Sequence, residues 1–322
     1  SWYLLSRCPL SVPSLCSSDL FVHNDTSYLE PFLNQLHLHY CDLCDGGAVF
    51  RLLAEVRPDE IYNLGAQTHV GISFEVPEYT TNVNGLGTLR LLEAMRALKL
   101  EKTTRFYQAS TSEIFGDTPP PQNELSAFHP RSPFAAAKLY AYHIVQNYRD
   151  AYGIHASNGI LFNHESPKRG HDFVTRTVTR AVAALSAGKQ EYVELGNMNA
   201  MRDWGHAVDY VEGQWLMLQK DTPDDYVLAT GRKKSVRDLC DEAFQCIGIT
   251  LEWRDSGSNE IGVNQDTGKT HVMVNPKFFR PLDVENLHGN PEKALKLLGW
   301  AAKITFEEMI KEMVEEDIRC LN

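Results

Sequence analysis

The chain has 322 residues, of which 43% are hydrophobic, and a formal net charge of -11 at pH 7. This hydrophobic fraction is enough for a buried core in one large domain or two modest ones. The acidic balance argues against a protein that binds nucleic acid or a membrane surface, because both partners require a basic patch. No apolar run approaches the ~20 residues that cross a bilayer, so we predict no membrane span.

The cysteines number seven and are spread along the chain. An odd, scattered set is typical of reduced thiols in the cytoplasm and not of a disulfide framework. Cys41 and Cys44 form a CDLC pair, but no second pair with ligand spacing follows, so we predict no metal site. The first eighteen residues hold one arginine and no acidic residue, which also fits the remnant of a transit peptide. An organelle therefore stays an alternative to the cytoplasm.

From Leu36 onward, short apolar runs alternate with amphipathic helices, a pattern typical of βαβ units. Strands are expected at LHLHYCDL (36–43), EIYNLGA (60–66), TRFYQASTS (104–112) and ASNGILFN (156–163). Helices are expected at GGAVFRLLAEV (46–56), NVNGLGTLRLLEAMRAL (82–98) and from the segment RSPFAAAKLYAY to about residue 152. We predict an α/β fold whose residues 36–165 form a Rossmann-like, doubly wound parallel sheet.

Beyond residue 165 the pattern changes to shorter helices mixed with loops and brief strands. This predicts a smaller, C-terminal substrate-binding lobe over residues 166–322, with some strands returning to the main sheet. Residues 256–269 are polar and contain glycines, which predicts an exposed loop. Residues 1–35 form a divergent N-terminal segment.

Several long strings carry a family resemblance. They include EIYNLGAQTHV, RFYQASTSEIFG, RSPFAAAKLYAY, NGILFNHESPKRG, RDWGHAVDYV and KFFRPLDVENLHGNPEKALKLLGW. From Leu36 to its C-terminus the chain resembles the GDP-mannose 4,6-dehydratases, which are extended short-chain dehydrogenases. The strings NHESPKRG and RDWGHAVDYV are the most specific, since related sugar-nucleotide enzymes differ there.

The resemblance implies a chemistry. Enzymes of this family bind NADP and GDP-mannose, remove a hydride from the sugar C4 and eliminate water across C5 and C6. They return the hydride to C6, which yields GDP-4-keto-6-deoxymannose. A tyrosinate takes the C4 hydroxyl proton, and a lysine lowers the pKa of that phenol and holds the nicotinamide ribose.

The resemblance places catalytic roles on three residues present here. Thr111 would steady the C4 oxygen, Glu113 would serve as C5 base and C6 acid, and Lys138 would be the family lysine. Thr111 and Glu113 follow a strand, at the carboxyl edge where open α/β sheets meet their ligands. The alternatives are an ordinary strand end with a capping hydroxyl and, for Lys138, a solvated surface lysine.

The resemblance also assigns binding positions. Cofactor contacts are expected at Asp42, Leu43, Gly65, Ala66, Gln67, Lys138, His164 and Arg169. Substrate contacts are expected at Ser112, Asn163, Arg202 and Arg280. The guanidinium fork of Arg202 and Arg280 suits a diphosphate, although a surface ion pair is the commoner role of a single arginine.

The catalytic tyrosine of the family is absent. Phe134 stands four residues before Lys138, on the same helix face, and it has no oxygen that exchanges a proton. Losing a positioned acid–base group typically costs about 10²–10⁴-fold in rate. Tyr140 lies about 240° round the helix from position 134, so it does not replace the phenol.

The glycine-rich turn of the family is also absent, because the first glycine of the chain is Gly46. Such a turn lets the backbone approach the cofactor phosphates. In one alternative, residues 22–33 correspond to the turn and first helix of the family, with the glycines replaced. In the other, residues 4–14 correspond to a later basic segment of the family, and the first βα unit is missing. The first βα unit is therefore degenerate or missing, and we expect NADP binding to be weakened or lost.

Three readings follow. The first is a catalytically impaired or silent homologue kept as a structural or regulatory subunit. It would form a homo-oligomer or hetero-oligomer through the helices at 85–97 and 134–151. The second is an active NADP-dependent dehydratase in which Thr111 or water replaces the phenol. The third is a GDP-sugar-binding scaffold without catalysis.

Overall fold

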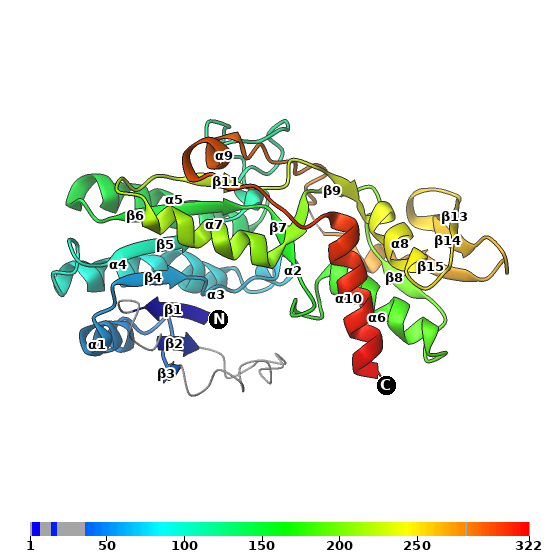
Figure 1. Ribbon diagram of the computed structural model, residues 1–322, viewed down its shortest axis with the longest axis horizontal. Coiled ribbons are helices and arrows are strands. Elements are labelled where there is room, and N and C mark those ends of the chain that lie inside the picture. Colours follow the sequence, from blue (N-terminus) through cyan, green and yellow to red (C-terminus); the bar gives the residue numbers. More distant parts are fainter. Residues whose placement is uncertain (1, 7–13, 18–35, 281, 322) are drawn as a thin grey trace.

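The computed structural model describes residues 2–6, 14–17, 36–280 and 282–321. Within these residues the main sheet has seven strands, which follow one another from the top to the bottom of Figure 1. In sheet order they are β11 (Tyr226–Leu228), β6 (Ala156–Leu161), β5 (Arg105–Ala109), β4 (Glu60–Asn63), β1 (Trp2–Ser6), β2 (Ser14–Ser17) and β3 (His37–Tyr40). The sheet confirms the predicted Rossmann-like α/β fold.

One strand departs from the parallel arrangement. β1 runs antiparallel to both of its neighbours, β4 and β2, whereas the other adjacent pairs of the sheet are parallel. Ser6, the last residue of β1, is paired with Glu60, the first residue of β4. The carboxyl end of β1 therefore lies at the edge where the parallel strands begin. The correspondence expected over residues 22–33 lies outside the described residues.

Helices cover both faces of the main sheet. The helices on the first face are α1 (Gly46–Val56), α4 (Gly87–Ala97) and α5 (Pro133–Tyr152), and α7 (Ala207–Gln219) lies on the second. Successive strand residues point to opposite faces. Ile61 and Phe106 accordingly pack in the core beneath α1, α4 and α5, whereas Tyr62 and Tyr107 pack with α7.

Local signals fix where α5 begins and ends. Ser132 caps its N-terminus, because its side chain accepts a hydrogen bond from the backbone N–H of Ala135 at 3.1 Å, and Pro133 occupies the first turn. Gly153 ends the helix with φ of 64°, a left-handed conformation that glycine adopts without strain. The predicted helix that carries Lys138 is thereby confirmed.

Short helices connect the strands at the carboxyl edge. They are α2 (Val70–Ser73), α3 (Pro77–Thr81), η2 (Asn82–Leu86) and the 3-10 turn η3 (Ser112–Ile114). η2 runs directly into α4, which confirms the long helix predicted over residues 82–98.

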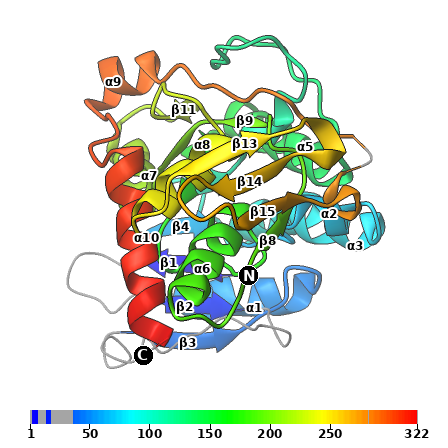
Figure 2. The ribbon, with the colours of Figure 1, turned by 90° about the vertical axis from the view of Figure 1, so that its right-hand side faces the viewer.

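A second group of elements lies beyond the carboxyl ends of the parallel strands, at the right of Figure 1 and facing the viewer in Figure 2. Its sheet has the order β13 (Leu251–Arg254), β14 (Ile261–Asn264), β15 (Thr270–Val274) and β8 (Val193–Leu195), and its helices are α6 (Val174–Ser186), α8 (Val236–Gln245) and α10 (Phe306–Leu321). The loop predicted over 256–269 is wrong in part, because β14 occupies four of these residues. Three of them, Gly262, Val263 and Asn264, are buried, and so short a run in polar surroundings gives little strand signal.

Small elements complete the structure. They are the parallel pair β7 (Asn163–Glu165) and β10 (Trp204–His206), the antiparallel pair β9 (Met201–Arg202) and β12 (Lys234–Ser235), and the helices η4 (Gly257–Asn259), η5 (Pro276–Phe278) and α9 (Glu292–Leu298). η4 lies between β13 and β14 of the second group, whereas α9 packs against β11 of the main sheet and against α7. The domain division at residue 165 stays a prediction. Among the described residues, no helix combines the length and apolar character needed to cross a bilayer.

Candidate active site

The first part of the site is built where β5 and α5 meet; we call it the lysine end, and it comprises Thr111, Glu113, Phe134 and Lys138. Thr111 caps the turn η3, and its Oγ1 accepts a hydrogen bond from the backbone N–H of Glu113 at 3.3 Å. Gly116 closes the turn with φ of 56°, and a Cβ there would lie 1.7 Å from the carbonyl oxygen of His129. The turn is therefore held tightly. Ser112 is buried within it, while Thr111 and Glu113 stay partly exposed.

Lys138 lies inside the protein, with 4% of its surface exposed. Its Nζ donates a hydrogen bond to the carbonyl oxygen of Ala109, the last residue of β5, at 2.9 Å. Burial lowers the pKa of this amine from 10.5 to about 8. The alternative of a solvated surface lysine is therefore wrong.

Phe134 is buried one helical turn before Lys138. Its backbone N–H donates a hydrogen bond to the Oγ of Ser73, the last residue of α2, at 3.2 Å. Tyr140 lies on a different face of α5 and is 40% exposed. It packs beside Gly85, where a Cβ would meet the Tyr140 Cδ1 at 3.1 Å. Its phenol is thus directed away from the lysine end, as the helical spacing predicted.

The loop over Gly65, Ala66 and Gln67 follows β4 and is fixed by its neighbours. The N–H of Gly65 donates to the Oδ1 of Asn63 at 3.3 Å, and the N–H of Gln67 donates to the Oδ1 of Asn84 at 2.8 Å. The side chain of Gln67 is also engaged, since its Nε2 donates to the carbonyl of His69 at 3.0 Å. These hydrogen bonds hold the loop at the carboxyl edge of the sheet, where the cofactor contacts are predicted.

Asp42 and Leu43 follow β3 and differ in which of their groups a ligand could reach. Asp42 is exposed, and its carboxylate accepts a hydrogen bond from the N–H of Cys44 at 2.8 Å. Leu43 is fully buried, and its carbonyl accepts a hydrogen bond from the Arg90 guanidinium at 2.9 Å. A cofactor contact at Leu43 would therefore involve the backbone and not the side chain.

Asn163, His164 and Arg169 lie at or just after β7. His164 Nδ1 lies 2.9 Å from the carbonyl of Phe162, and the ring stacks on Tyr210 with centroids 4.8 Å apart. Burial lowers the pKa of His164 to about 4, so the ring is neutral at pH 7. Arg169 Nε lies 3.1 Å from the Oε2 of Glu165. A ligand contact by Arg169 would have to compete with this ion pair.

The second part of the site is the arginine end, which comprises His69, Arg202, Arg280 and Asp283. Asp283 lies between the two guanidiniums, with its Oδ1 3.6 Å from Arg202 and 3.8 Å from Arg280. Burial lowers the pKa of Arg202, and the negative charges of Glu113 and Asp283 oppose that shift. The charge of Glu113 at the lysine end therefore acts on Arg202 at the arginine end. The side chain of Arg280 is 36% exposed and is more accessible than that of Arg202.

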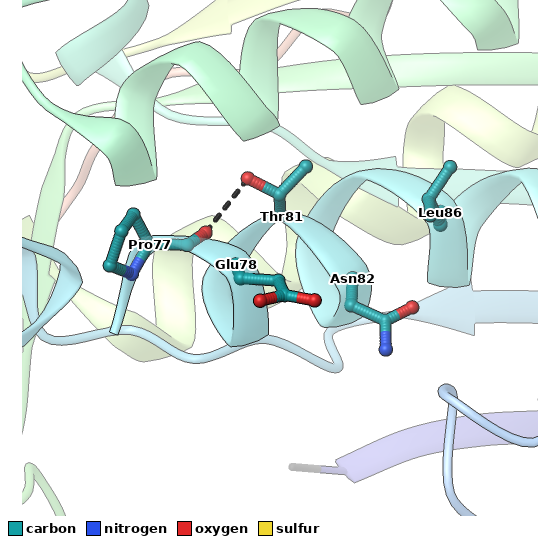
Figure 3. A pocket seen from close by; sticks show the side chains of 5 residues that line it. All are labelled: Pro77, Glu78, Thr81, Asn82 and Leu86. Atoms are coloured by element: carbon teal, nitrogen blue, oxygen red, sulfur yellow. Dashed lines mark hydrogen bonds between the residues drawn. The ribbon is translucent and has the colours of Figure 1, made fainter.

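A groove of about 510 Å³ lies along α3 and η2, and Figure 3 shows the side chains that line it. The lining residues are Pro77, Glu78, Thr81, Asn82 and Leu86. Within it, the hydroxyl of Thr81 donates to the carbonyl of Pro77 at 2.9 Å. None of the predicted site residues lines this groove, so the predicted chemistry lies elsewhere.

Three residues of the site were not singled out from the sequence: His69, Ser73 and Asp283. Asp283 follows Arg280 by three residues in RPLD, a spacing that brings the two charges together. His69 stands within AQTHV, next to the predicted cofactor loop, but a single histidine gives no spacing signal. The described residues contain no cluster of three or more His, Cys, Asp or Glu side chains arranged to hold a metal ion.

The sheet, its buried lysine on α5 and the ligand-facing turn after β5 define a Rossmann-like α/β protein of the short-chain dehydrogenase type. The sequence profile of the family described as GDP-mannose 4,6 dehydratase matches residues 17–313. "GDP-mannose 4,6 dehydratase 2" of Caenorhabditis elegans is 56% identical over 282 residues, which cover 87% of this chain and 74% of the relative. The chain belongs to the GDP-mannose 4,6-dehydratase family.

Solved structures with lower identity share the fold. UDP-glucose 4-epimerase from Thermotoga maritima, solved with UDP-glucose, matches with a TM-score of 0.79 at 22% identity, over 95% of this chain and 91% of its own. RMD from Pseudomonas aeruginosa, complexed with NADPH, matches with a TM-score of 0.75 at 22% identity, over 91% of this chain and 95% of its own. These likenesses establish the fold of the main sheet and not its chemistry.

The residues that would contact the nicotinamide end of NADP suit this cofactor better than those that would contact its phosphate end. At the nicotinamide end, the Lys138 amine and the buried Ser110 hydroxyl, which has no hydrogen-bond partner among the described residues, suit a ribose. At the phosphate end, a parallel strand followed by a glycine-rich turn is required. Among the described residues, the strand beside β4 is the antiparallel β1. The described residues at the phosphate end therefore do not fit this arrangement.

Proposed function

We propose that this chain binds a GDP-sugar in the manner of its family and that its dehydratase chemistry is impaired. The observation that carries the proposal is Phe134, buried one turn before Lys138 at the position of the family tyrosine. A phenyl ring neither accepts nor donates a proton. The C4 hydroxyl of a bound sugar would therefore lack its acid–base partner, although the chain keeps Thr111, Glu113 and Lys138.

The family supports GDP-mannose as the sugar nucleotide and NADP as the cofactor. The nucleotide-bound neighbours, one with UDP-glucose and one with NADPH, support the same ligand classes. When bound, the cofactor supplies a hydride acceptor. The antiparallel β1 beside β4 supports weakened NADP binding. The partly exposed guanidinium of Arg280 supports binding of the diphosphate of the sugar nucleotide.

The test combines two measurements on the purified chain. Mass spectrometry of released nucleotides reports whether dinucleotide is retained, and chromatography of GDP-mannose incubated with the protein and added NADP reports turnover. We expect little retained dinucleotide, and turnover at least about 10²-fold below that of a tyrosine-containing relative. Retained NADP together with turnover at the rate of that relative would establish the active reading instead.

We also propose that the chain assembles through α4 and α5. Much of the apolar stripe of these helices lies in the core of the protomer, including Leu91, Leu92 and Val145. Leu86, the last residue of η2, and Tyr140 remain 39% and 40% exposed, and Tyr140 packs beside Gly85, the residue before Leu86. An exposed apolar pair on two adjacent helices suits a symmetric, self-complementary contact.

Sedimentation tests the assembly. Tyr140→Glu places a charge at the centre of the proposed contact, so we expect the parent to sediment as an oligomer and this variant as a monomer. Val208→Glu is the matched control, because Val208 is 64% exposed on α7, on the other face of the main sheet. A parent that is monomeric at all concentrations, or equal dissociation by both variants, contradicts the proposal.

A further inference from the structure

His69 is held rigidly at the start of α2, immediately after the loop of residues 65–67. Its Nδ1 accepts a hydrogen bond from the backbone N–H of Ile72 at 3.1 Å and caps the helix. Gly71 leaves room for the ring to fold back, since a Cβ there would meet the His69 Cε1 at 3.1 Å. The ring position is thus set by the backbone of its own turn.

The cap also sets which ring nitrogen carries the proton. A neutral imidazole has one donor and one acceptor nitrogen. Because Nδ1 accepts from Ile72, Nε2 carries the hydrogen and is the donor. Burial and then the positive charge of Arg280 lower the pKa of His69, while Asp172 and Glu75 oppose that shift. His69 is therefore a neutral N–H donor at pH 7.

Charged and aromatic side chains surround His69. Arg280, which follows η5, lies close enough to influence its charge. Phe173, just before α6, lies with its ring centroid 6.3 Å from that of His69, and the Arg169 guanidinium stacks over this phenyl ring at 3.6 Å. The positive charge of Arg280 is only partly offset by Asp283, which it shares with Arg202.

The other end of α2 is tied to the lysine end. Ser73 Oγ accepts the backbone N–H of Phe134 at 3.2 Å, and Ser73 is four residues after His69. The one-turn helix α2 therefore fixes the separation between His69 and position 134. Because Arg280 acts on His69 at one end of α2 and Phe134 contacts Ser73 at the other, a ligand that spans Arg280 and the lysine end runs alongside α2.

We propose that His69 is a substrate-binding residue whose Nε2–H donates a hydrogen bond to the diphosphate of the bound nucleotide sugar. This assignment rests on the proposed function, because it takes the same GDP-sugar as its ligand. His69 thus has two separate roles: Nδ1 caps α2 and Nε2 binds the phosphate.

Two substitutions separate these roles on the full chain. In His69→Asn the amide oxygen replaces Nδ1 as the cap acceptor, but no group reaches the position of Nε2. In His69→Gln the amide N–H reaches the position of Nε2, but the cap is lost. Calorimetric titration with GDP and with guanosine, together with thermal unfolding, measures both roles.

We expect GDP affinity to fall about tenfold in His69→Asn and to stay within about twofold in His69→Gln. The affinity for guanosine should stay unchanged in both variants. The midpoint temperature of thermal unfolding should fall by about 1–3 °C in His69→Gln, which loses the cap, and should stay unchanged in His69→Asn, which keeps it.

Other results overturn the assignment. Equal GDP affinity in the parent and in His69→Asn means that Nε2 does not bind the diphosphate. Parallel losses of affinity and stability in both variants mean that the ring is only structural, and an equal loss for guanosine means that the contact is not to phosphate. If the parent protein binds no GDP, both the proposed function and the assignment of His69 are wrong. If the parent binds GDP and the affinity does not depend on His69, only the assignment of His69 is wrong.

Discussion

The lysine end and the arginine end of the site are built differently. At the lysine end, Phe134 and Lys138 are buried on one helix face, and the amine is held by the carbonyl of Ala109. At the arginine end, Arg280 is partly exposed and shares Asp283 with the buried Arg202. The lysine end has kept its packing but lacks the phenol that would exchange the C4 hydroxyl proton, whereas the arginine end has kept its charges and hydrogen-bond donors.

This difference shows how one part of a mechanism can be absent without disturbing the fold. Phenylalanine and tyrosine fill nearly the same volume, so the core around position 134 needs no rearrangement. Phosphate binding depends on charge and on N–H donors that lie on other elements, namely α2 and the segment after η5. Substitutions at one end should therefore change catalysis or ligand binding without changing the other end.

The largest effect is expected from restoring the phenol. Phe134→Tyr places a hydroxyl one turn from Lys138, whose positive charge favours the phenolate. We expect turnover of GDP-mannose with added NADP to rise by about 10²–10⁴-fold, while GDP affinity changes less than about twofold. Chromatography of the sugar-nucleotide product measures the gain.

Two variants control this experiment. Tyr140→Phe should leave the residual turnover of the parent unchanged, because Tyr140 lies on an exposed face of α5. Phe134→Tyr combined with Lys138→Met should lose most of the gain. If Phe134→Tyr binds GDP and NADP normally and stays as slow as the parent, the defect lies outside the phenol.

The next effect concerns the stability cost of Lys138. Its folded pKa of about 8 lies below the ordinary value of 10.5, so between these pH values the unfolded chain binds more protons than the folded one. Stability from this group therefore rises with pH across that window, and the cost of the buried charge is fully present below pH 8. It is on the order of 3 kcal/mol at pH 7.

Lys138→Met should therefore be more stable than the parent at pH 7, by up to about 3 kcal/mol, and the difference should shrink towards pH 10. The Ala109 carbonyl keeps a partner, because the Gln108 side chain donates to it at 3.1 Å. Urea unfolding at several pH values measures the difference. Lys102→Met is the matched control, since Lys102 also donates to a carbonyl but is exposed. A Lys138→Met difference that is constant with pH would refute the buried-charge account.

The sequence predicted the regular parts of the fold well, because periodicity carries that information. The segments that became β3 to β6, α1, α4 and α5 have clear apolar patterns and caps such as Ser132 and Gly153. The reversal of β1 was not predicted, because strand direction depends on pairing with β4 and leaves no local signal.

The same distinction holds within the site. Lys138 and Thr111 were predicted by their place in long motifs, and their positions relative to α5 and β5 follow from helix and strand geometry. Asp283, Ser73 and His69 were not, because their importance comes from residues distant in sequence. Ser73 matters because it meets Phe134, 61 residues later, and Asp283 because it meets Arg202. Such contacts exist only in the folded chain, because they join residues that are distant in sequence.

The third prediction tests the arginine end through ligand binding, without a measurement of turnover. Arg280→Gln removes the exposed guanidinium of the arginine end, so we expect GDP affinity to fall about tenfold or more. Arg254→Gln is the control, because Arg254 pairs with Glu252 on the exposed surface of β13 and should change the affinity by less than about twofold. Titration calorimetry at two salt concentrations measures both. Equal affinities in the parent and in Arg280→Gln would place the diphosphate elsewhere.

The smallest effect should come from Ser73, which joins the two ends. Ser73→Ala removes the acceptor for the Phe134 N–H and the donor to the carbonyl of Val70, so we expect a loss of about 1–2 kcal/mol in the free energy of unfolding. GDP affinity should change by less than about threefold, because His69 still accepts the hydrogen bond from the backbone N–H of Ile72 that fixes its ring.

Ser132→Ala is the control for Ser73→Ala. It removes the N-cap of the same helix at a similar stability cost of about 1 kcal/mol, without touching α2. In the Phe134→Tyr background, Ser73→Ala should slow turnover more than Ser132→Ala does, since only Ser73 fixes position 134 relative to His69. Equal turnover in the two double variants would show that α2 does not set the spacing between the lysine end and the arginine end, and the two ends would then be independent in position as well as in chemistry.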